Sequence, residues 1–157
     1  MIYDLFVQIV LSFVGTIGFS IIFNVPIKEL IYCGVAGAFG WLVYQISITF
    51  FADAAVAAIF LSAASVTIIA RFISYRRKMP VLVYMIPGVI PMVPGAGIYY
   101  TMFYAVMGDY SEALLQGAHT LRTAGLIAVG LLVVLTLPRK LFMIKIENKN
   151  KEAKQNG

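Results

Sequence analysis

Apolar residues run through this 157-residue chain in five long blocks, and short polar or turn-forming segments separate the blocks. Each block approaches the ~20 residues that an α-helix needs to cross the hydrocarbon core of a bilayer. The blocks cover residues 5–23, 30–50, 53–73, 81–107 and 114–137. The pattern therefore predicts an all-α integral membrane protein with about five transmembrane helices.

The fourth block contains a segment that cannot form a regular helix, because residues 87–100 read PGVIPMVPGAGIYY. Proline removes a backbone donor and clashes with the preceding turn, and glycine lowers helix propensity. The helix-breaking residues are Pro87, Gly88, Pro91, Pro94, Gly95 and Gly97. We expect them to break the fourth helix at an unwound stretch, where glycine can adopt any positive φ that the break requires.

The unwound stretch is the candidate substrate site. Non-helical backbone at membrane depth survives only inside protein or along a water-filled cavity, and secondary transporters bind substrates at such discontinuous helices. The start of the second half-helix, near residues 97–99, would present its positive dipole end to a carboxylate. Tyr99 and Tyr100 follow the break, with hydroxyls that face either a pocket or the membrane interface. The alternative is a purely architectural kink that binds nothing.

Composition narrows the class of protein. The sequence is 61% hydrophobic and 12% charged, with a mean hydropathy of +0.91, which is far too apolar for a soluble domain. The sequence has one cysteine, Cys33, and one histidine, His119, so it cannot form an intrachain disulfide or a Cys/His metal cluster. The net charge of +5 comes from basic residues that flank the blocks, which is typical of topology signals rather than of nucleic-acid binding. We expect no metal, no cofactor and no nucleic acid.

The basic residues also predict an orientation. With five crossings, every Lys and Arg except Arg122 falls on the same side, and the positive-inside rule makes that side cytoplasmic. A fourth block that returned to its own side would split the basic residues evenly, so we expect it to span. Residues 1–138 then form a membrane domain of the bacterial inner membrane with its N-terminus outside. Residues 139–157 form a basic cytoplasmic tail that is disordered at its end.

A few polar residues within the blocks are further candidates for a binding site. Gln45 lies deep in the second block, where bonding to another helix and contact with substrate are equally reasonable. His119 and Arg122 share one helix face at i, i+3. Arg122 is the best candidate for pairing with an anion, and its pairing with Asp109 or Glu112 is the alternative.

Small residues mark the expected contacts between helices, because they let helix backbones approach closely in a membrane. In the second block they are Gly34, Ala36, Gly37 and Gly40, and in the third Ala54, Ala58, Ser62 and Ser65. We expect these residues to pack helices together rather than to bind substrate.

The string P-G-x-I-P-x-V-P-G-x-G-x-Y-Y at residues 87–100 resembles the small, YjjB-like membrane subunit of the threonine/serine exporter family. The resemblance covers residues 5–137. It implies export of small hydrophilic metabolites, namely threonine and serine in some members and succinate in a two-component bacterial system. It also implies a larger partner subunit with membrane spans of its own and a soluble N-terminal region, which this sequence lacks. It supplies no established binding residues.

Two classes of function remain open. The chain is either a transport subunit that contributes part of a substrate pathway, or an assembly subunit whose broken helix shapes a contact with the larger chain. Five spans are few for a complete pathway, so a heteromeric or homo-oligomeric assembly is expected in both cases. We expect no enzyme, because no Ser/His/Asp, paired intramembrane Asp or HExxH constellation is present. There is no P-loop either, so export would depend on an ion gradient or on the substrate gradient.

Overall fold

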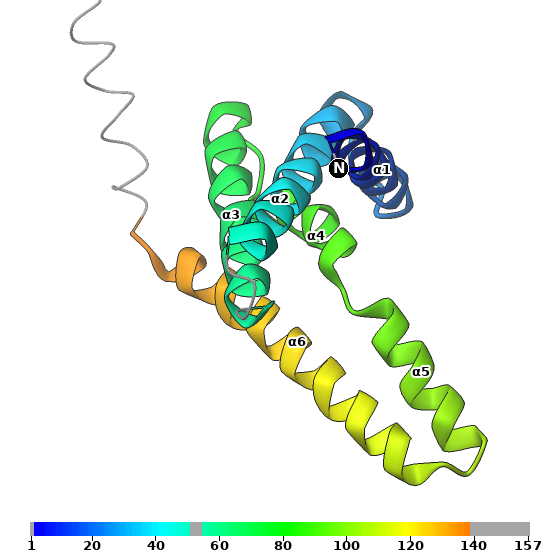
Figure 1. Ribbon diagram of the computed structural model, residues 1–157. Helices are drawn as coiled ribbons and strands as arrows, with labels where there is room; N and C mark the ends of the chain where they lie inside the picture. The colour runs from blue at the N-terminus through cyan, green and yellow to red at the C-terminus, as the bar shows by residue number, and fades with distance from the viewer. Residues whose placement is uncertain (1, 51–54, 139–157) are drawn as a thin grey trace, which may run out of the picture.

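The computed structural model describes residues 2–50 and 55–138, which are helical apart from short turns (Figure 1). Within them lie the helices α1 (Ile2–Ile22), α2 (Leu30–Phe50), α3 (Ala55–Arg77), α4 (Leu82–Val89), α5 (Gly95–Val106) and α6 (Tyr110–Thr136). Two 3₁₀ turns, η1 (Ile27–Glu29) and η2 (Ile90–Met92), precede α2 and follow α4. No strand occurs in these residues, and the predicted all-α fold is confirmed. The predicted tail, residues 139–157, lies outside the described residues.

Four of these helices, α1, α2, α3 and α6, are each long and apolar enough to cross a membrane. The segment from α4 through η2 passes the same test only together with α5, and the two parts meet at a bend of 54°. The described residues therefore hold four spans, or five if the bent pair crosses. The predicted fourth helix is present and is broken, but its non-helical stretch is much shorter than predicted. Pro87 and Gly88 lie within α4, Gly95 and Gly97 lie within α5, and between them only Val93 and Pro94 lie outside a helix or 3₁₀ turn.

α1 and α2 pack side by side and run in opposite directions. Ser12 of α1 donates its hydroxyl hydrogen to the Gly37 carbonyl of α2 at 3.2 Å. One turn earlier on α1, Gln8 meets Gln45, which lies two turns later on α2. This antiparallel pairing is the one expected of two consecutive spans joined by a short loop.

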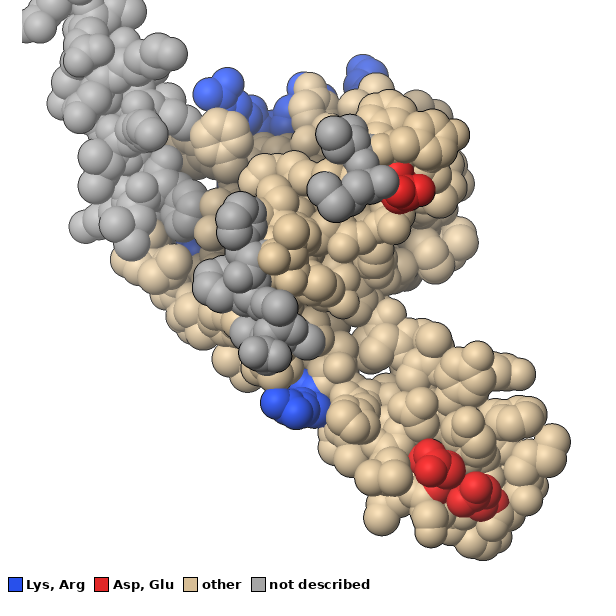
Figure 2. All heavy atoms as spheres, viewed as in Figure 1, with Lys and Arg blue, Asp and Glu red and all other residues tan. Residues whose placement is uncertain are grey.

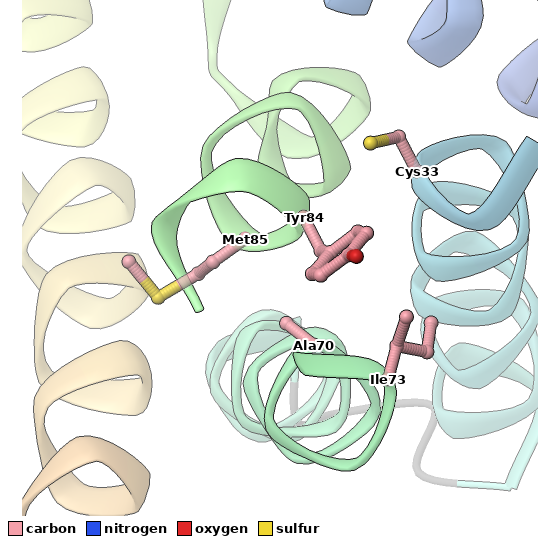
Figure 3. Packing of buried hydrophobic residues seen from close by; sticks show 5 residues of the cluster. All are labelled: Cys33, Ala70, Ile73, Tyr84 and Met85. Carbon is pink, nitrogen blue, oxygen red and sulfur yellow. The ribbon is translucent and has the colours of Figure 1, made fainter. Parts of the chain in front are cut away.

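A shared core joins α2, α3 and α4. Its buried members are labelled in Figure 3: Cys33 from α2, Ala70 and Ile73 from α3, and Tyr84 and Met85 from α4. At the other contact between α2 and α3, Ser62 donates to the Gly40 carbonyl at 2.7 Å. Along α2, Cys33 comes before Gly40. Along α3, their neighbours come in the reverse order, because Ala70 and Ile73 near Cys33 follow Ser62, which bonds to Gly40. α3 therefore runs antiparallel to α2.

The glycine-rich face of α2 is buried, as its sequence predicts. An added Cβ at Gly34 would lie 2.7 Å from the Phe13 ring of α1, and one at Gly40 would collide with Val66 of α3. On α3, Ala58, Ser62 and Ser65 are buried as well. The predicted contact faces are confirmed for the described residues, while Ala54 lies outside them.

α4 runs beside α2 in the same direction, from one end of the bundle to its middle. Near the start of both helices, the Cys33 thiol donates to the Val83 carbonyl at 3.3 Å. Further along, the Met92 methyl lies against Gly40, which is the central residue of α2, ten residues from either end. The break that follows Met92 therefore lies level with the middle of the α2 span.

α6 runs beside α3, also in the same direction. Gly130 packs on α3 so closely that an added Cβ would lie 2.9 Å from the Phe60 carbonyl oxygen and 3.0 Å from the Ala63 methyl. One turn later on α6, the Val134 carbonyl accepts a hydrogen bond from buried Arg71, two turns further along α3. A shared direction of α3 and α6 is the arrangement expected if the bent α4–α5 unit between them crosses the membrane once. A re-entrant loop would have left α6 antiparallel to α3.

α5 and the first half of α6 form an antiparallel hairpin that projects from the bundle (Figure 1). Gly97 of α5 packs against Thr120, and Thr101 packs against Gly117. Gly108, at the turn, has a φ of 82°, a conformation that favours glycine. This hairpin carries the residues that follow the break.

Five crossings predict that the two ends of α6 lie on opposite sides of the membrane. A reporter fused after Gly157 should report the cytoplasmic side and one inserted near Tyr110 the external side, because the basic residues follow the positive-inside rule. Paired alkaline phosphatase and fluorescent-protein fusions measure this. The same side for both positions would contradict the five-crossing arrangement.

Candidate functional site

The break between η2 and α5 is the candidate functional site. Val93 is extended, with φ −60° and ψ 130°, and Pro94 has φ −74° and ψ 61° before α5 begins at Gly95. The Gly95 N–H bonds back to the Val93 carbonyl at 2.7 Å. Within the described residues no acceptor is found for the N–H groups of Ala96 and Gly97. Two backbone donors therefore stand at the positive end of the α5 dipole.

The residues before the break are held tightly in the bundle. Pro87 and Gly88 are buried, and an added Cβ at Gly88 would lie 3.0 Å from a Val66 methyl group. Pro91 lies in η2, next to Met92, whose sulfur accepts a hydrogen bond from the Ser62 hydroxyl at 3.0 Å. The first half of the proline/glycine cluster thus fixes α4 and η2 against α2 and α3.

The two glycines after the break differ in their surroundings. Gly95 is exposed, and no atom lies within 4 Å of an added Cβ. Gly97 packs against Thr120 of α6, so it allows α5 and α6 to approach. Neither glycine has a positive φ, so the break does not need the left-handed conformation that the sequence analysis allows for. Only Gly95 borders open space.

Tyr99 and Tyr100 lie on the outer side of α5. Tyr99 is 63% exposed and Tyr100 46% exposed, because Gly97 and Thr101 occupy the side that faces α6. The Tyr99 and Tyr100 rings meet edge to face, with centroids 5.3 Å apart. Both hydroxyls are thus available to a ligand, to lipid headgroups or to a second chain.

Gln45 lies apart from the break and joins α1 to α2. Its side-chain amide donates to the Gln8 carbonyl oxygen, which also accepts from the Trp41 indole N–H at 3.3 Å. Of the two roles that the sequence leaves open for Gln45, the structure provides the contact between helices.

His119 and Arg122 are exposed on α6 and face away from α5. At about 100° per residue, Arg122 lies roughly 200° around the helix from Thr120, which packs on α5. The side chain of Asp109 caps α6 by accepting from the Glu112 N–H at 3.1 Å. Arg122 is ten residues, ~15 Å, further along, and in the described chain it makes no ion pair with either acid. The structure thus brings together the break residues but not Gln45, His119 or Arg122.

An ionic cluster that the sequence does not predict, with Glu29 and Tyr84 buried and Arg77 exposed, anchors the start of α4. The Arg77 guanidinium donates to both carboxylate oxygens of Glu29, at 2.7 and 3.1 Å, and the Tyr84 hydroxyl donates to Glu29 at 2.7 Å. Arg77 also lies over the Tyr32 ring, 4.8 Å from its centre. The sequence signal is an acidic residue just before an apolar block, but nothing local shows which cation pairs with it. The cluster fastens η1, α3 and α4 together at one end of the bundle.

The charges of the described residues separate along the molecule. Lys28, Arg76, Arg77 and Lys78 lie at the end of the bundle where α3 stops, and Figure 2 shows Asp and Glu at the tip of the projecting hairpin. The same residues contain no group of three His, Cys, Asp or Glu side chains that could hold a metal ion. The site chemistry available is therefore that of backbone donors, hydroxyls and aromatic rings.

The Glu29–Arg77 cluster predicts a specific pattern of stabilities. Arg77→Ala should lower the melting temperature of the purified protein more than the double variant Glu29→Ala/Arg77→Ala does. The reason is that removing one partner leaves a buried charge uncompensated, whereas removing both does not. Tyr84→Phe, which removes a single hydrogen bond, serves as a milder reference. A double variant whose loss equals the sum of the two single losses would show that the pair is not coupled.

Comparison with known proteins gives the family. The family described as "Threonine/Serine exporter, ThrE" matches residues 8–137, which include all six described helices except the first turns of α1. No solved structure was found to match the chain. Because the match covers most of the sequence, this multi-pass membrane protein belongs to the threonine/serine exporter (ThrE) family.

Proposed function

We propose that this chain is a membrane subunit of a secondary exporter and that it acts with a larger membrane partner. Its substrates would be threonine and serine, which the family name indicates, or succinate-like dicarboxylates, which share the carboxylate group. The observation that carries the proposal is the break at mid-span, where two N–H groups of α5 have no acceptor among the described residues. Discontinuous helices at this depth are the binding elements of many transporters.

The start of α5 suits a carboxylate. The N–H groups of Ala96 and Gly97 can each donate to an anionic oxygen, and the helix dipole adds to the attraction. Hydrogen bonds to a charged group are roughly twice as strong as those between neutral groups. Because helical side chains tilt toward the N-terminus, Tyr99 and Tyr100 extend toward the break and can contact the rest of the substrate. Pro91 and Pro94 keep this backbone from closing into a continuous helix.

The proposed site is open on one side, which supports a second chain. Val93 is 44% exposed, Tyr99 is 63% exposed and Gly95 borders open space. In a lone chain this unwound backbone would face lipid, which offers it no hydrogen bonds. A larger subunit, or a further copy of this chain, would cover it and complete the pathway.

The orientation follows from the charges. Five of the six described basic residues lie on α3 near its end, in the loop after it or in η1, and Arg122, near the middle of α6, is the exception. The positive-inside rule supports a cytoplasmic location for this end in a bacterial inner membrane, with the N-terminus outside.

A non-transporting assembly subunit is the second candidate. The observation in its favour is that Pro87, Gly88 and Gly97 all serve helix packing in the structure. In that case the bend would only direct the α5–α6 hairpin toward the larger chain. Gly95 separates the two candidates, because it has no packing role within the described chain.

Replacing Gly95 by leucine should reduce threonine efflux at least tenfold in cells that express both subunits, without lowering the melting temperature. The new side chain would tilt toward the helix N-terminus and cover the Ala96 and Gly97 N–H groups, while it meets no atom of the chain. The measurement is efflux of labelled threonine, serine and succinate, together with the amount of inserted protein.

Gly18→Leu on α1 is the matched control, because Gly18 also borders open space but lies far from the break in the sequence. It should leave efflux unchanged. Normal efflux from the Gly95→Leu variant would remove the break from the substrate pathway and favour the assembly subunit.

A further inference from the structure

One face of α6 is exposed in the described chain. Ala113, Ile127, Gly130 and Val134 are the buried residues of this helix. On the opposite side lie four exposed residues, which we name the Arg122 face: Ala118, Arg122, Gly125 and Val129. At about 100° per residue, these four lie within roughly 60° of one another around the helix. They form a narrow strip with an arginine in it.

The backbone of Arg122 lies at the depth of the middle of the α2 span. Gly97, three residues after the break, packs on Thr120, and the break is level with Gly40 at the middle of α2. Arg122 also lies ~18 Å from the start of α6 and ~21 Å from its end. A cationic side chain at this depth is unfavourable in lipid and is expected to face protein or water. The described chain offers it neither an ion pair nor a hydrogen bond.

Gly125 leaves room for a contact outside the chain on the same strip as Arg122. Gly15 and Gly18 of α1 are equally open, so the openness of Gly125 counts only together with the cation beside it. A glycine weakens a helix relative to alanine, so it usually has a local reason. On the same helix, an added Cβ at Gly117 would lie 3.3 Å from the Thr101 methyl group, and one at Gly130 would lie 3.0 Å from the Ala63 methyl group. Gly125 has no atom within 4 Å of an added Cβ. A small residue on an exposed membrane face permits the close approach of another helix.

We propose that the Arg122 face binds a transmembrane helix of the partner subunit, and that this helix places an Asp or Glu carboxylate opposite Arg122 at mid-membrane depth. The proposal rests on the two-chain exporter proposed above. Gly125 and Ala118 let the two backbones approach, and the carboxylate neutralises the guanidinium in a setting of low dielectric.

Charge complementarity favours a different chain over a second copy. Two copies inserted in the same orientation would place Arg122 opposite Arg122, because equivalent residues share one depth. The carboxylates of the described chain lie at or near helix ends: Asp4, Glu29, Asp109 and Glu112. A substrate carboxylate could pair with Arg122 only while bound, whereas the charge needs a partner throughout the transport cycle.

The test uses the chain co-expressed with the larger exporter subunit, each with its own affinity tag, and extracted in mild detergent. Arg122→Glu and Gly125→Leu should each lower the amount of larger subunit that co-purifies at least tenfold. Arg122→Lys keeps the charge and should stay within twofold of the unaltered chain. Gly18→Leu, an equally open glycine on α1, should change nothing.

Photo-crosslinking gives a readout that does not depend on a disruptive variant. A photoreactive residue in place of Val129 should yield an adduct with the mass of this chain plus the larger subunit. Normal co-purification of Arg122→Glu, or an adduct with the mass of two copies of this chain, would overturn the proposal. So would intact association with a raised KM for threonine, since Arg122 would then serve the substrate. A crosslinked complex that fails to export threonine would instead contradict the proposed function and leave the docking surface standing.

Discussion

A chain that interrupts a helix inside a bilayer must find partners for the backbone groups that the interruption frees, because lipid supplies none. The rest of this structure depends on how that constraint is met at the α4–α5 break. Met92, directly before the break, packs against Gly40 near the middle of α2 and Ser62 near the middle of α3. The N–H groups of Ala96 and Gly97 directly after it are left without a described acceptor. The backbone before the break is therefore held by packing against α2 and α3, whereas the N–H groups after the break are available for binding.

This division also explains the arrangement of the two half-helices. α4 is held by burial of Tyr84 and Gly88 and by the Glu29–Arg77 ion pair at its start. α5 contacts chiefly α6, and the hairpin that they form leaves the bundle at the 54° bend. Because α4 is fixed in the bundle and α5 projects from it, the break, the tyrosines of α5 and the Arg122 face are all exposed and can contact a second chain.

The parts of the fold that rest on local signals could be predicted from the sequence. The lengths of the apolar blocks predicted the spans, the proline/glycine cluster predicted the break, and the spacing of the glycines predicted the contact face of α2. The positions of the candidate site residues relative to one another could not be predicted, because the direction in which a side chain faces depends on tertiary packing. The Gly97–Thr120 contact sets which side of α6 meets α5, and it turns Arg122 away from the break. The Glu29–Arg77 pair joins residues 48 positions apart, so no local pattern identifies it.

We propose that the backbone donors at the start of α5 bind the substrate carboxylate, and amide NMR can follow this binding at the two N–H groups concerned. The chain, labelled with ¹⁵N and assembled with its larger partner in lipid nanodiscs, is titrated with threonine. We expect saturable downfield shifts of the Ala96 and Gly97 amide protons, because these N–H groups would donate to an anion. Shifts confined to other residues, or saturable binding with these two amides unmoved, would contradict the proposal.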